Sequence, residues 1–394
     1  MKKLSIKDID LKNKRILIRC DFNVPLDKDL KVGDDTRIKE SLPTIKYALE
    51  GGAKKVILMS HLGRPEGKIV EDLRLNPVGG RLEELLGERV KKLDDCIGED
   101  VKRKIEESEE KVILLENLRF HPEEEKNDTE FSKKLASLAD IYINDAFGAA
   151  HRPHASVEGI TKFLLSVSGL LMEKEIDFLG SLLEDPQRPF VAILGGAKVS
   201  DKIGVLQNLL RKVDRILIGG GMAYTFLKAE GKSIGNSKLE KEKLEIAKDI
   251  LNKAKEYGVK ISLPLDSIVA DRISPEAKIQ IYKENIPEGL MGTDIGPETI
   301  ELFKEELKDV KTIFWNGPLG IFEIDKFNKG TEEIAKFITD LDAKIIIGGG
   351  DTVSAIKKFK LEDRMSHIST GGGAALEFLE GRILPGIAAL KDRE

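Results

Sequence analysis

The chain has 394 residues, of which 41% are hydrophobic and 34% are charged, and its net charge at pH 7 is -5. That length is long for one hydrophobic core and suggests two domains of ordinary size. Lys and Arg residues are spread along the chain and no apolar run approaches the length of a membrane span, so we expect neither a nucleic-acid partner nor a membrane.

Short apolar runs separated by charged, helix-like stretches recur through the first half of the chain. They are rich in Ile, Val and Leu at consecutive positions, which is typical of parallel strands covered by helices on both faces. These runs span residues 16–18, 56–59, 112–115 and 141–143.

Polar and cationic residues follow these runs, where the carboxyl ends of parallel strands meet at one edge of a sheet. Arginine forks match carboxylate and phosphate oxygens in pairs, so this edge suits a small acid bearing both groups. Asp21 and Asn23 would bind a hydroxyl of that acid, although a turn or capping role is the competing interpretation for Asp21 alone. The remaining candidates are His61, Arg64, Arg119, His121, His151, Arg152 and His154.

One helix is predicted between the halves, because Met172, Ile176, Leu179 and Leu183 recur at helical spacing in a charged background. Two prolines at 186 and 189 would end it. We interpret this helix as a rigid connection between two domains.

In the second half, strand-like runs end in clusters of glycines. A glycine cluster at the carboxyl end of a parallel strand lets backbone amides approach phosphates closely, so nucleotide binding is favoured over simple tight turns. Neither G-x-x-x-x-G-K-[ST] nor G-x-G-x-x-G is present, which argues against a P-loop NTPase and a dinucleotide-binding dehydrogenase. The runs are 190–194, 216–218, 345–347 and 367–370, and a further strand is predicted at 312–315.

Several residues beside these glycines are candidate phosphate or metal ligands. Lys198 and Lys202 lie four apart and would share one face of a helix opening near Ser200, although such lysines are usually solvent-exposed. Asp351 would hold magnesium on the phosphates and Thr352 would cap the next helix, capping alone being the alternative for both. The amides of Gly371-Gly372-Gly373, after Ser369 and Thr370, would form an anion-binding nest, with a solvated turn as the alternative.

The only cysteines are Cys20 and Cys96, too few and too far apart in sequence for a disulfide framework or a metal-binding pattern. A reducing compartment, the cytoplasm, follows as the expected location.

With these residues assembled, the chain resembles the phosphoglycerate kinase family over nearly its whole length. The resemblance rests on Arg19-Cys20-Asp21-Phe22-Asn23-Val24-Pro25, Ser60-His61-Leu62-Gly63-Arg64-Pro65, Glu116-Asn117-Leu118-Arg119-Phe120, Asp145-Ala146-Phe147-Gly148, Gly195-Gly196-Ala197-Lys198-Val199-Ser200-Asp201-Lys202, Trp315-Asn316-Gly317-Pro318, Gly348-Gly349-Gly350-Asp351 and Ser369-Thr370-Gly371-Gly372-Gly373.

The resemblance implies reversible, magnesium-dependent phosphoryl transfer between ATP and the carboxylate of 3-phosphoglycerate in glycolysis, giving ADP and 1,3-bisphosphoglycerate. It implies that phosphoglycerate is bound by Asp21, Asn23, Arg37, His61, Arg64, Arg119 and Arg152. It implies that nucleotide is bound by Lys198, Lys202, Gly292, Glu323, Gly349, Gly350, Asp351 and Thr352, with Glu323 toward the ribose. Arg37, Lys198, Gly372 and Gly373 would surround the phosphoryl group in transit.

We therefore expect an α/β fold with two Rossmann-like domains, each a parallel sheet with helices on both faces, joined by a helix and hinge. Residues 1–169 would bind phosphoglycerate, 170–188 would form the connecting helix and linker, and 189–378 would bind nucleotide. By resemblance, 379–394 would pack back on the first domain, and the protein would be a monomer. The competing hypotheses are an NAD-dependent dehydrogenase and a non-catalytic nucleotide-binding module, which would not need the arginines of the first half.

Overall fold

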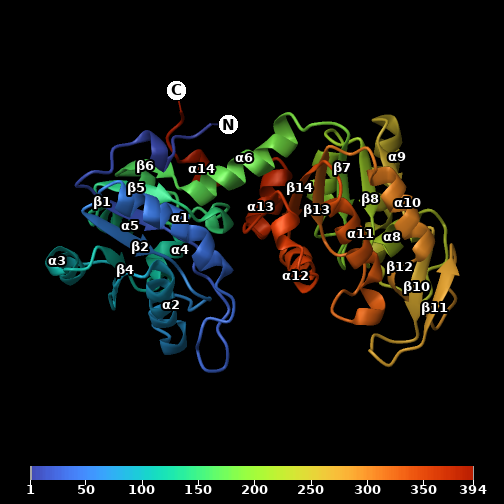
Figure 1. The fold of residues 1–394 in the computed structure, drawn as a ribbon, viewed down its shortest axis with the longest axis horizontal. Coiled ribbons are helices and arrows are strands. Elements are labelled where there is room, and N and C mark those ends of the chain that lie inside the picture. The colour runs from blue at the N-terminus through green and yellow to red at the C-terminus, as the bar shows by residue number, and fades with distance from the viewer. Residues whose placement is uncertain (1, 394) are drawn as a thin grey trace. The chain divides into compact units, whose positions relative to one another are not determined.

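The computed structural model describes residues 2–393 and divides the chain into two compact units. The first contains residues up to Asp177 together with those from Ile383 on, and the second contains Phe178–Arg382. The division falls inside helix α6 (Leu170–Glu184), the helix predicted from the spacing of its apolar residues. Figure 1 shows each unit as a sheet flanked by helices.

The first unit is built on a six-stranded sheet whose paired strands are all parallel, in the order β3-β4-β2-β1-β5-β6. Its strands are β1 (Arg15–Arg19), β2 (Lys55–Met59), β3 (Val90–Lys92), β4 (Val112–Leu114), β5 (Ile141–Asn144) and β6 (Leu165–Ser168). Its helices are α1 (Thr36–Glu50), α2 (Asn76–Leu86), α3 (Glu99–Glu107), α4 (Pro122–Glu125), α5 (Thr129–Ala136) and α14 (Pro385–Ala388). Short 3₁₀ turns are η1 (Ile6–Asp8), η2 (Glu71–Leu73), η3 (Leu118–Phe120), η4 (Phe147–Ala149) and η5 (Gly159–Lys162).

The second unit repeats this plan, with a parallel sheet in the order β15-β14-β13-β7-β8-β9. Its strands are β7 (Phe190–Leu194), β8 (Arg215–Ile218), β9 (Lys260–Ser262), β13 (Thr312–Asn316), β14 (Lys344–Gly348) and β15 (His367–Ile368). Its helices are α7 (Ile203–Leu209), α8 (Ala223–Ala229), α9 (Leu244–Glu256), α10 (Pro297–Leu307), α11 (Lys329–Thr339), α12 (Gly350–Lys358) and α13 (Gly373–Leu379). Its 3₁₀ turns are η6 (Lys241–Lys243), η7 (Asp325–Phe327) and η8 (Glu362–Arg364).

The predicted α/β fold with two parallel sheets is confirmed, and every apolar run singled out from the sequence forms a strand. Strand interiors such as Ile16, Val56 and Ile346 are fully buried, as continuous apolar runs between two helical layers require. Two strands end earlier than predicted, because β4 ends at Leu114 rather than Leu115 and β15 ends at Ile368 rather than Thr370.

A second sheet in the same unit was not predicted. It is antiparallel, in the order β11-β10-β12, and contains β10 (Asp266–Ala270), β11 (Ile279–Lys283) and β12 (Met291–Ile295). Ile279 and Ile281 are exposed on β11, so this strand lacks the fully buried pattern that marks the parallel strands.

The last part of the chain packs in the first unit. Lys391 N donates to Ser166 O at 3.0 Å, Leu4 N donates to Lys391 O at 2.8 Å, and Gly386 N donates to Ala150 O at 2.8 Å. Among the described residues, no helix combines the length and the apolar character needed to span a bilayer.

Candidate active site

In each parallel sheet, two neighbouring central strands are connected to strands that lie on opposite sides of the pair. In the first unit β1 continues to β2 on one side, whereas β5 continues to β6 on the other. In the second unit the corresponding pair is β13 and β7. Ligands of open parallel sheets bind beyond the carboxyl ends of such a pair, so each unit has one preferred site.

The carboxyl edge of the first sheet carries the predicted phosphoglycerate residues. Asp21 and Asn23 follow β1, and His61 and Arg64 follow β2. Arg119 lies in η3 after β4, and Arg152 follows β5 and η4.

Arg37 also reaches this edge, although it follows no strand. It lies in the first turn of α1, and its Nη1 donates to Asp21 Oδ2 at 2.6 Å. The Arg37 side chain is 34% exposed and that of Asp21 is 11% exposed, so the cation keeps an open side. The fold therefore brings Arg37 to the residues with which the resemblance groups it.

The backbone of Gly63 joins two further candidates. Its N–H donates to Asn23 Oδ1 at 2.9 Å, and its carbonyl accepts a 2.8 Å hydrogen bond from Arg119 Nη1. Arg119 is buried, with Nε 3.3 Å from Glu125 Oε1. Burial and the charge of Arg152 lower the pKa of Arg119 to about 10.

Positive charge converges on His61, which is buried. Its pKa is held well below its ordinary value, first by burial and then by the charges of Arg19, Arg119, Arg152 and Arg37. Burial first, and then the charges of Arg119, Arg19 and Arg152, lower the pKa of His154 to about 3. The arginines around these two histidines make this edge favourable for an anion.

Two arginines at this edge remain uncommitted. Within residues 2–393, the guanidinium groups of Arg64 and Arg152 make no hydrogen bond or ion pair, and Arg64 is exposed. Both are therefore available to an anionic ligand.

Sequence reasoning missed Arg19 as an individual site residue. It ends β1 and is only 1% exposed, donating from Nε to Ser156 Oγ at 2.9 Å and from Nη1 to Cys20 O. Ser156 in turn donates to buried Glu124 at 2.6 Å. The available signal was a charged residue directly after the apolar run at 16–18.

In the second unit, the turns after β7 and β13 touch backbone to backbone. A Cβ on Gly195 would lie 2.2 Å from Pro318 O, and one on Gly317 would lie 2.1 Å from Gly195 O. Gly195 N donates to Asn316 O at 3.0 Å, which fixes this contact. Only glycines allow so close an approach.

Beside these turns lies a pocket of about 470 Å³. Of the predicted nucleotide residues, Gly292, Glu323 and Asp351 line it, and Glu323 and Asp351 are exposed. The pocket combines glycine turns with apolar side chains, which suits a phosphorylated ligand with a flat ring. The other lining residues are Gly196, Ala197, Gly220, Gly221, Tyr224, Asn236, Lys238, Ile273, Met291, Thr293, Pro318, Gly320, Ile321 and Phe322.

The apolar lining of this pocket was not predicted from the sequence. Met291 belongs to the unpredicted antiparallel sheet, and Phe322 lies in a loop. Tyr224 lies in α8, with its hydroxyl 3.2 Å from Ser267 Oγ.

The expected helical pairing of Lys198 and Lys202 is wrong. Helix α7 begins only at Ile203 with Lys202 as its N-cap, so Lys198 lies in the preceding loop, where it is exposed. Lys202 Nζ bonds Asn316 Oδ1. Burial lowers the pKa of Lys202, and the charges of Asp201 and Asp351 oppose that effect.

The expected capping role of Thr352 is also wrong. Helix α12 begins at Gly350 with Gly349 as its N-cap and has no side-chain cap. Thr352 is buried inside the first turn, where its Oγ1 accepts a 2.6 Å hydrogen bond from Gly317 N. It therefore braces the turn after β13.

Gly349 and Gly350 follow β14, and Gly372 and Gly373 stand at the start of α13 after β15. Gly371 N donates to Ser369 Oγ at 3.1 Å. None of these glycines lines the 470 Å³ pocket as it stands, whereas Asp351, in the first turn of α12, does. An exposed carboxylate at a phosphate-sized turn is a suitable oxygen ligand for magnesium.

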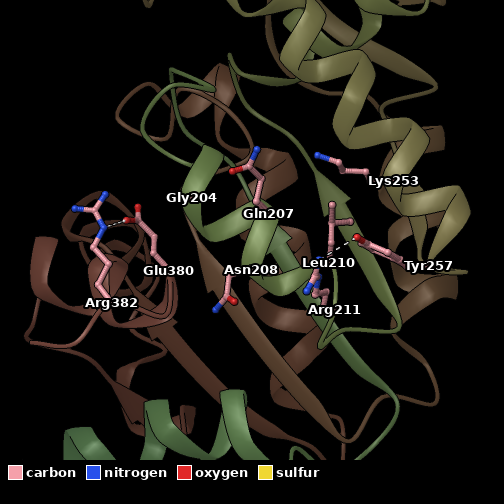
Figure 2. A pocket seen from close by; sticks show the side chains of 9 residues that line it. All are labelled: Gly204, Gln207, Asn208, Leu210, Arg211, Lys253, Tyr257, Glu380 and Arg382. Carbon is pink, nitrogen blue, oxygen red and sulfur yellow. Dashed lines mark hydrogen bonds and ion pairs between the residues drawn. The ribbon is translucent and has the colours of Figure 1, made fainter.

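A second depression of about 500 Å³ in this unit contains no predicted site residue. Figure 2 shows it between α7, α9 and the end of α13. Its cations all have partners: Arg211 stacks over Tyr257, Lys253 pairs with Asp249, and Arg382 pairs with Glu380. It offers no obvious site for an anion.

Comparisons with known proteins agree on one family. A family model described as phosphoglycerate kinase matches residues 6–382. The chain is 58% identical to the phosphoglycerate kinase of Dictyoglomus turgidum, covering 99% of this chain and 98% of the relative. It is 53% identical to that of Moorella thermoacetica over 100% of both chains.

Solved structures agree. The structure of phosphoglycerate kinase from Coxiella burnetii matches with a TM-score of 0.90 at 43% identity, and that from Pyrococcus horikoshii OT3 with 0.84 at 34%. Each match covers 98% of both chains. The dehydrogenase and non-catalytic hypotheses are set aside.

Proposed function

We propose that this chain, which belongs to the phosphoglycerate kinase family, binds one of its two substrates at each of its two parallel sheets. The enzyme is a phosphotransferase of glycolysis that uses ATP or ADP and a phosphoglycerate. The observation that carries the proposal is the contrast between the two carboxyl edges. One has converging arginines around neutral histidines, and the other has glycine turns beside an apolar pocket.

Phosphoglycerate binds in the first unit. Arg64 and Arg152 are uncommitted cations, and Arg119 and Arg37 add charge at the same edge. Guanidinium forks pair with carboxylate and phosphate oxygens. Asp21 accepts a hydrogen bond from the substrate hydroxyl, and Asn23 donates one to it.

Nucleotide binds in the second unit. The ring lies against the apolar lining contributed by Met291, Ile321 and Phe322, with Glu323 toward the ribose. Gly292 forms part of the same wall, where a Cβ would lie 1.9 Å from Tyr224 Oη, so any larger residue would displace Tyr224.

The phosphates extend toward the remaining predicted nucleotide residues: Lys198, Lys202, Gly349, Gly350, Asp351 and Thr352. Lys202 and Asp351 interact electrostatically, which supports a shared role at the phosphates. Thr352 acts by holding the turn at Gly317. Asp351 would hold Mg²⁺, which when bound supplies positive charge to the phosphate oxygens.

Transfer is direct and in line. A carboxylate oxygen of 3-phosphoglycerate forms a bond to the γ-phosphorus as the bond to the ADP oxygen breaks, giving 1,3-bisphosphoglycerate and ADP. The attacking carboxylate is already ionised at neutral pH, so no general base is needed. Arg37, Lys198 and the amides of Gly372 and Gly373 stabilise charge on the phosphoryl group in transit.

Because the two ligand sets belong to separate units, we propose that a hinge closes when both substrates are bound, which excludes water from the phosphoryl group. Small-angle scattering should give a smaller radius of gyration with both ligands than with either alone. Unchanged dimensions would contradict hinge closure. A coupled assay with ATP, Mg²⁺ and 3-phosphoglycerate tests the activity, and loss of turnover on chelating Mg²⁺ tests the metal requirement.

We further propose that the enzyme is a monomer in the cytoplasm. Both cysteines are free and buried, as expected in a reducing compartment. The monomeric state rests on the family. Sedimentation velocity should give one species of about the chain's own mass, and cell fractionation should recover it in the cytoplasm. A concentration-independent dimer, or an exported protein, would contradict these assignments.

A further inference from the structure

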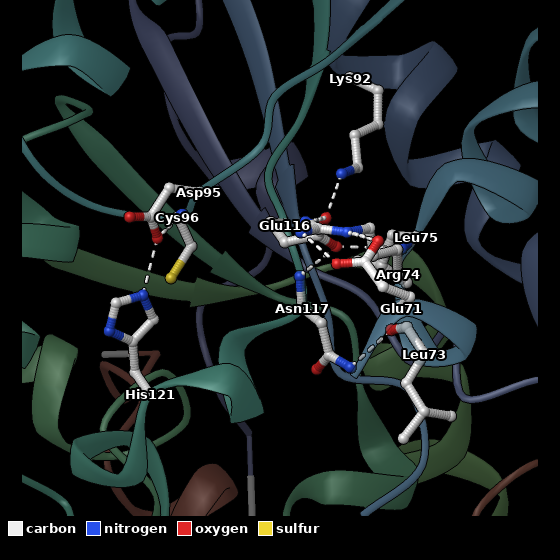
Figure 3. A network of polar contacts seen from close by, with 10 residues as sticks. All are labelled: Glu71, Leu73, Arg74, Leu75, Lys92, Asp95, Cys96, Glu116, Asn117 and His121. Atoms are coloured by element: carbon white, nitrogen blue, oxygen red, sulfur yellow. Dashed lines mark hydrogen bonds and ion pairs between the residues drawn. The ribbon is translucent and has the colours of Figure 1, made fainter. Parts of the chain in front are cut away.

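Three side chains of metal-binding types meet in the first unit, and the proposed transfer uses none of them. Asp95 and Cys96 follow β3, whereas His121 follows η3 on the segment after β4. Their ligand atoms all lie within 4.8 Å of one another. Figure 3 shows the Cys96 sulfur beside the contact between Asp95 and His121.

The three groups already form an organised set. His121 Nε2 and Asp95 Oδ1 are 2.7 Å apart, and the same Oδ1 accepts a 2.7 Å hydrogen bond from Cys96 N. Cys96 is fully buried, while the side chains of His121 and Asp95 are 27% and 51% exposed. Cys96 therefore forms the buried side of the set, and solvent can reach the set where His121 and Asp95 are exposed.

The neighbouring carboxylate of Glu116 is committed elsewhere. It forms ion pairs with Arg74 at 3.0 Å and with Lys92, and it accepts backbone hydrogen bonds from Leu75 and Asn117. Figure 3 shows these contacts apart from the Asp95, Cys96 and His121 set. Among residues 2–393, the ligand set is therefore Asp95, Cys96 and His121, and a fourth position is left for water.

We propose that Asp95 Oδ1, Cys96 Sγ and His121 Nε2 bind one zinc ion, with water as the fourth ligand. One thiolate, one imidazole and one carboxylate are the donors that tetrahedral Zn²⁺ accepts in proteins. Magnesium favours oxygen ligands, so the metal of phosphoryl transfer does not compete for the site. Binding replaces the hydrogen bond between Asp95 Oδ1 and His121 Nε2. The neutral imidazole then carries its one proton on Nδ1, and the thiol proton leaves to solvent.

The surroundings of the thiol favour a cation. The carboxylates of Asp95, Glu124 and Glu116 interact electrostatically with the Cys96 thiol. Those charges oppose a free thiolate but attract a divalent cation, and a coordinated thiol is deprotonated outright.

The ion would join the segment after β3 to the segment that carries Arg119, two residues before His121. Its expected role is to stabilise this part of the first unit, since anything that binds only the folded state raises its stability. The melting temperature of the metal-free full chain should rise with added zinc.

Cobalt is the spectroscopic probe, added as Co²⁺ to the chelator-treated full chain. We expect one equivalent to give a thiolate-to-cobalt charge-transfer band and the visible bands of tetrahedral coordination. Zinc should then displace the cobalt. Calorimetry with ZnCl₂ should give one site per chain.

Three variants and one control test the assignment. Cys96→Ser should abolish the charge-transfer band. His121→Gln and Asp95→Asn, which change partly exposed side chains and should fold, should each weaken zinc binding by at least about 10²-fold, more than loss of an outer-shell partner costs. Cys20→Ser removes the other buried thiol and should leave zinc binding unchanged.

Absence of the charge-transfer band would overturn the proposal. So would equal zinc affinity in the native chain, His121→Gln and Asp95→Asn, or loss of the band in Cys20→Ser rather than Cys96→Ser.

Discussion

Arg19 Nη2 lies 3.1 Å from His61 Nδ1, between two buried side chains. A guanidinium is always a donor and cannot accept a hydrogen bond, so Nδ1 of His61 must be the acceptor. The imidazole is therefore neutral with its proton on Nε2. Arg19 positions His61 so that it presents one N–H donor.

We expect His61 to remain in this tautomer through the physiological pH range. Its pKa lies well below 6.5, so ¹⁵N NMR of its ring should show no titration near the usual histidine value and a protonated Nε2. His61→Gln keeps an N–H donor, whereas His61→Leu should bind phosphoglycerate at least about 10-fold more weakly than His61→Gln. A ring that titrates near pH 6.5 would contradict the assigned tautomer.

Arg37 should act on the transition state more than on binding. Arg37→Ala should lower kcat by about 10²-fold or more with a milder change in KM, as loss of a charge-stabilising donor does. Arg64→Ala should mainly raise KM for phosphoglycerate. Arg37→Lys, which keeps the charge but not the fork, serves as the intermediate control. Near-normal kcat in Arg37→Ala would remove it from the catalytic residues.

Buried Asp145 should make stability depend on pH. Burial raises its pKa to about 7, despite hydrogen bonds from Leu171 N at 2.9 Å and Met172 N at 3.2 Å. The folded state therefore binds a proton that the unfolded chain releases near pH 4, so this contribution to stability is lost as pH rises from about 4 through about 7.

Asp145→Asn keeps the acceptor oxygen and cannot ionise. Denaturant unfolding across this pH range should show a smaller fall in the free energy of unfolding for the variant than for the native chain. An identical pH dependence would mean that Asp145 is already ionised in the fold.

The contact between the turns after β7 and β13 should be essential for nucleotide binding. In Gly195→Ala the new methyl would collide with the Pro318 carbonyl, so the turn must shift. Affinity for ADP should fall while affinity for phosphoglycerate is retained. Gly180→Ala is the matched control, since a Cβ there meets nothing within 4 Å, and it should bind both ligands normally. Normal ADP affinity in Gly195→Ala would contradict the importance of this contact.

The parallel strands could be predicted because each contains consecutive apolar residues, such as those around Ile16 and Ile346, which put apolar side chains on both faces of a covered sheet. Strand β11 was not predicted, because Ile279 and Ile281 are exposed and the strand lacks a run of consecutive apolar residues. His61 and Arg119 could also be predicted, because each follows one of these apolar runs.

Other site residues depended on information that periodicity does not contain. Arg37 reaches Asp21 only through the packing of α1, and only family resemblance pointed to it. The spacing of Lys198 and Lys202 fitted a helix, but α7 begins only at Ile203, after the loop that contains Lys198. Cys96 and His121 follow different strands, so no short sequence motif indicates that their side chains meet.

The division of substrates between the two edges is tested most directly by calorimetry on two intact variants, each titrated with both ligands. Arg152→Ala should lose affinity for 3-phosphoglycerate and keep its affinity for magnesium-ADP. Glu323→Ala should lose affinity for magnesium-ADP and keep its affinity for 3-phosphoglycerate. The reverse pattern, or loss of both affinities in both well-folded variants, would contradict the assignment of phosphoglycerate to the arginine-rich edge and nucleotide to the glycine-rich one.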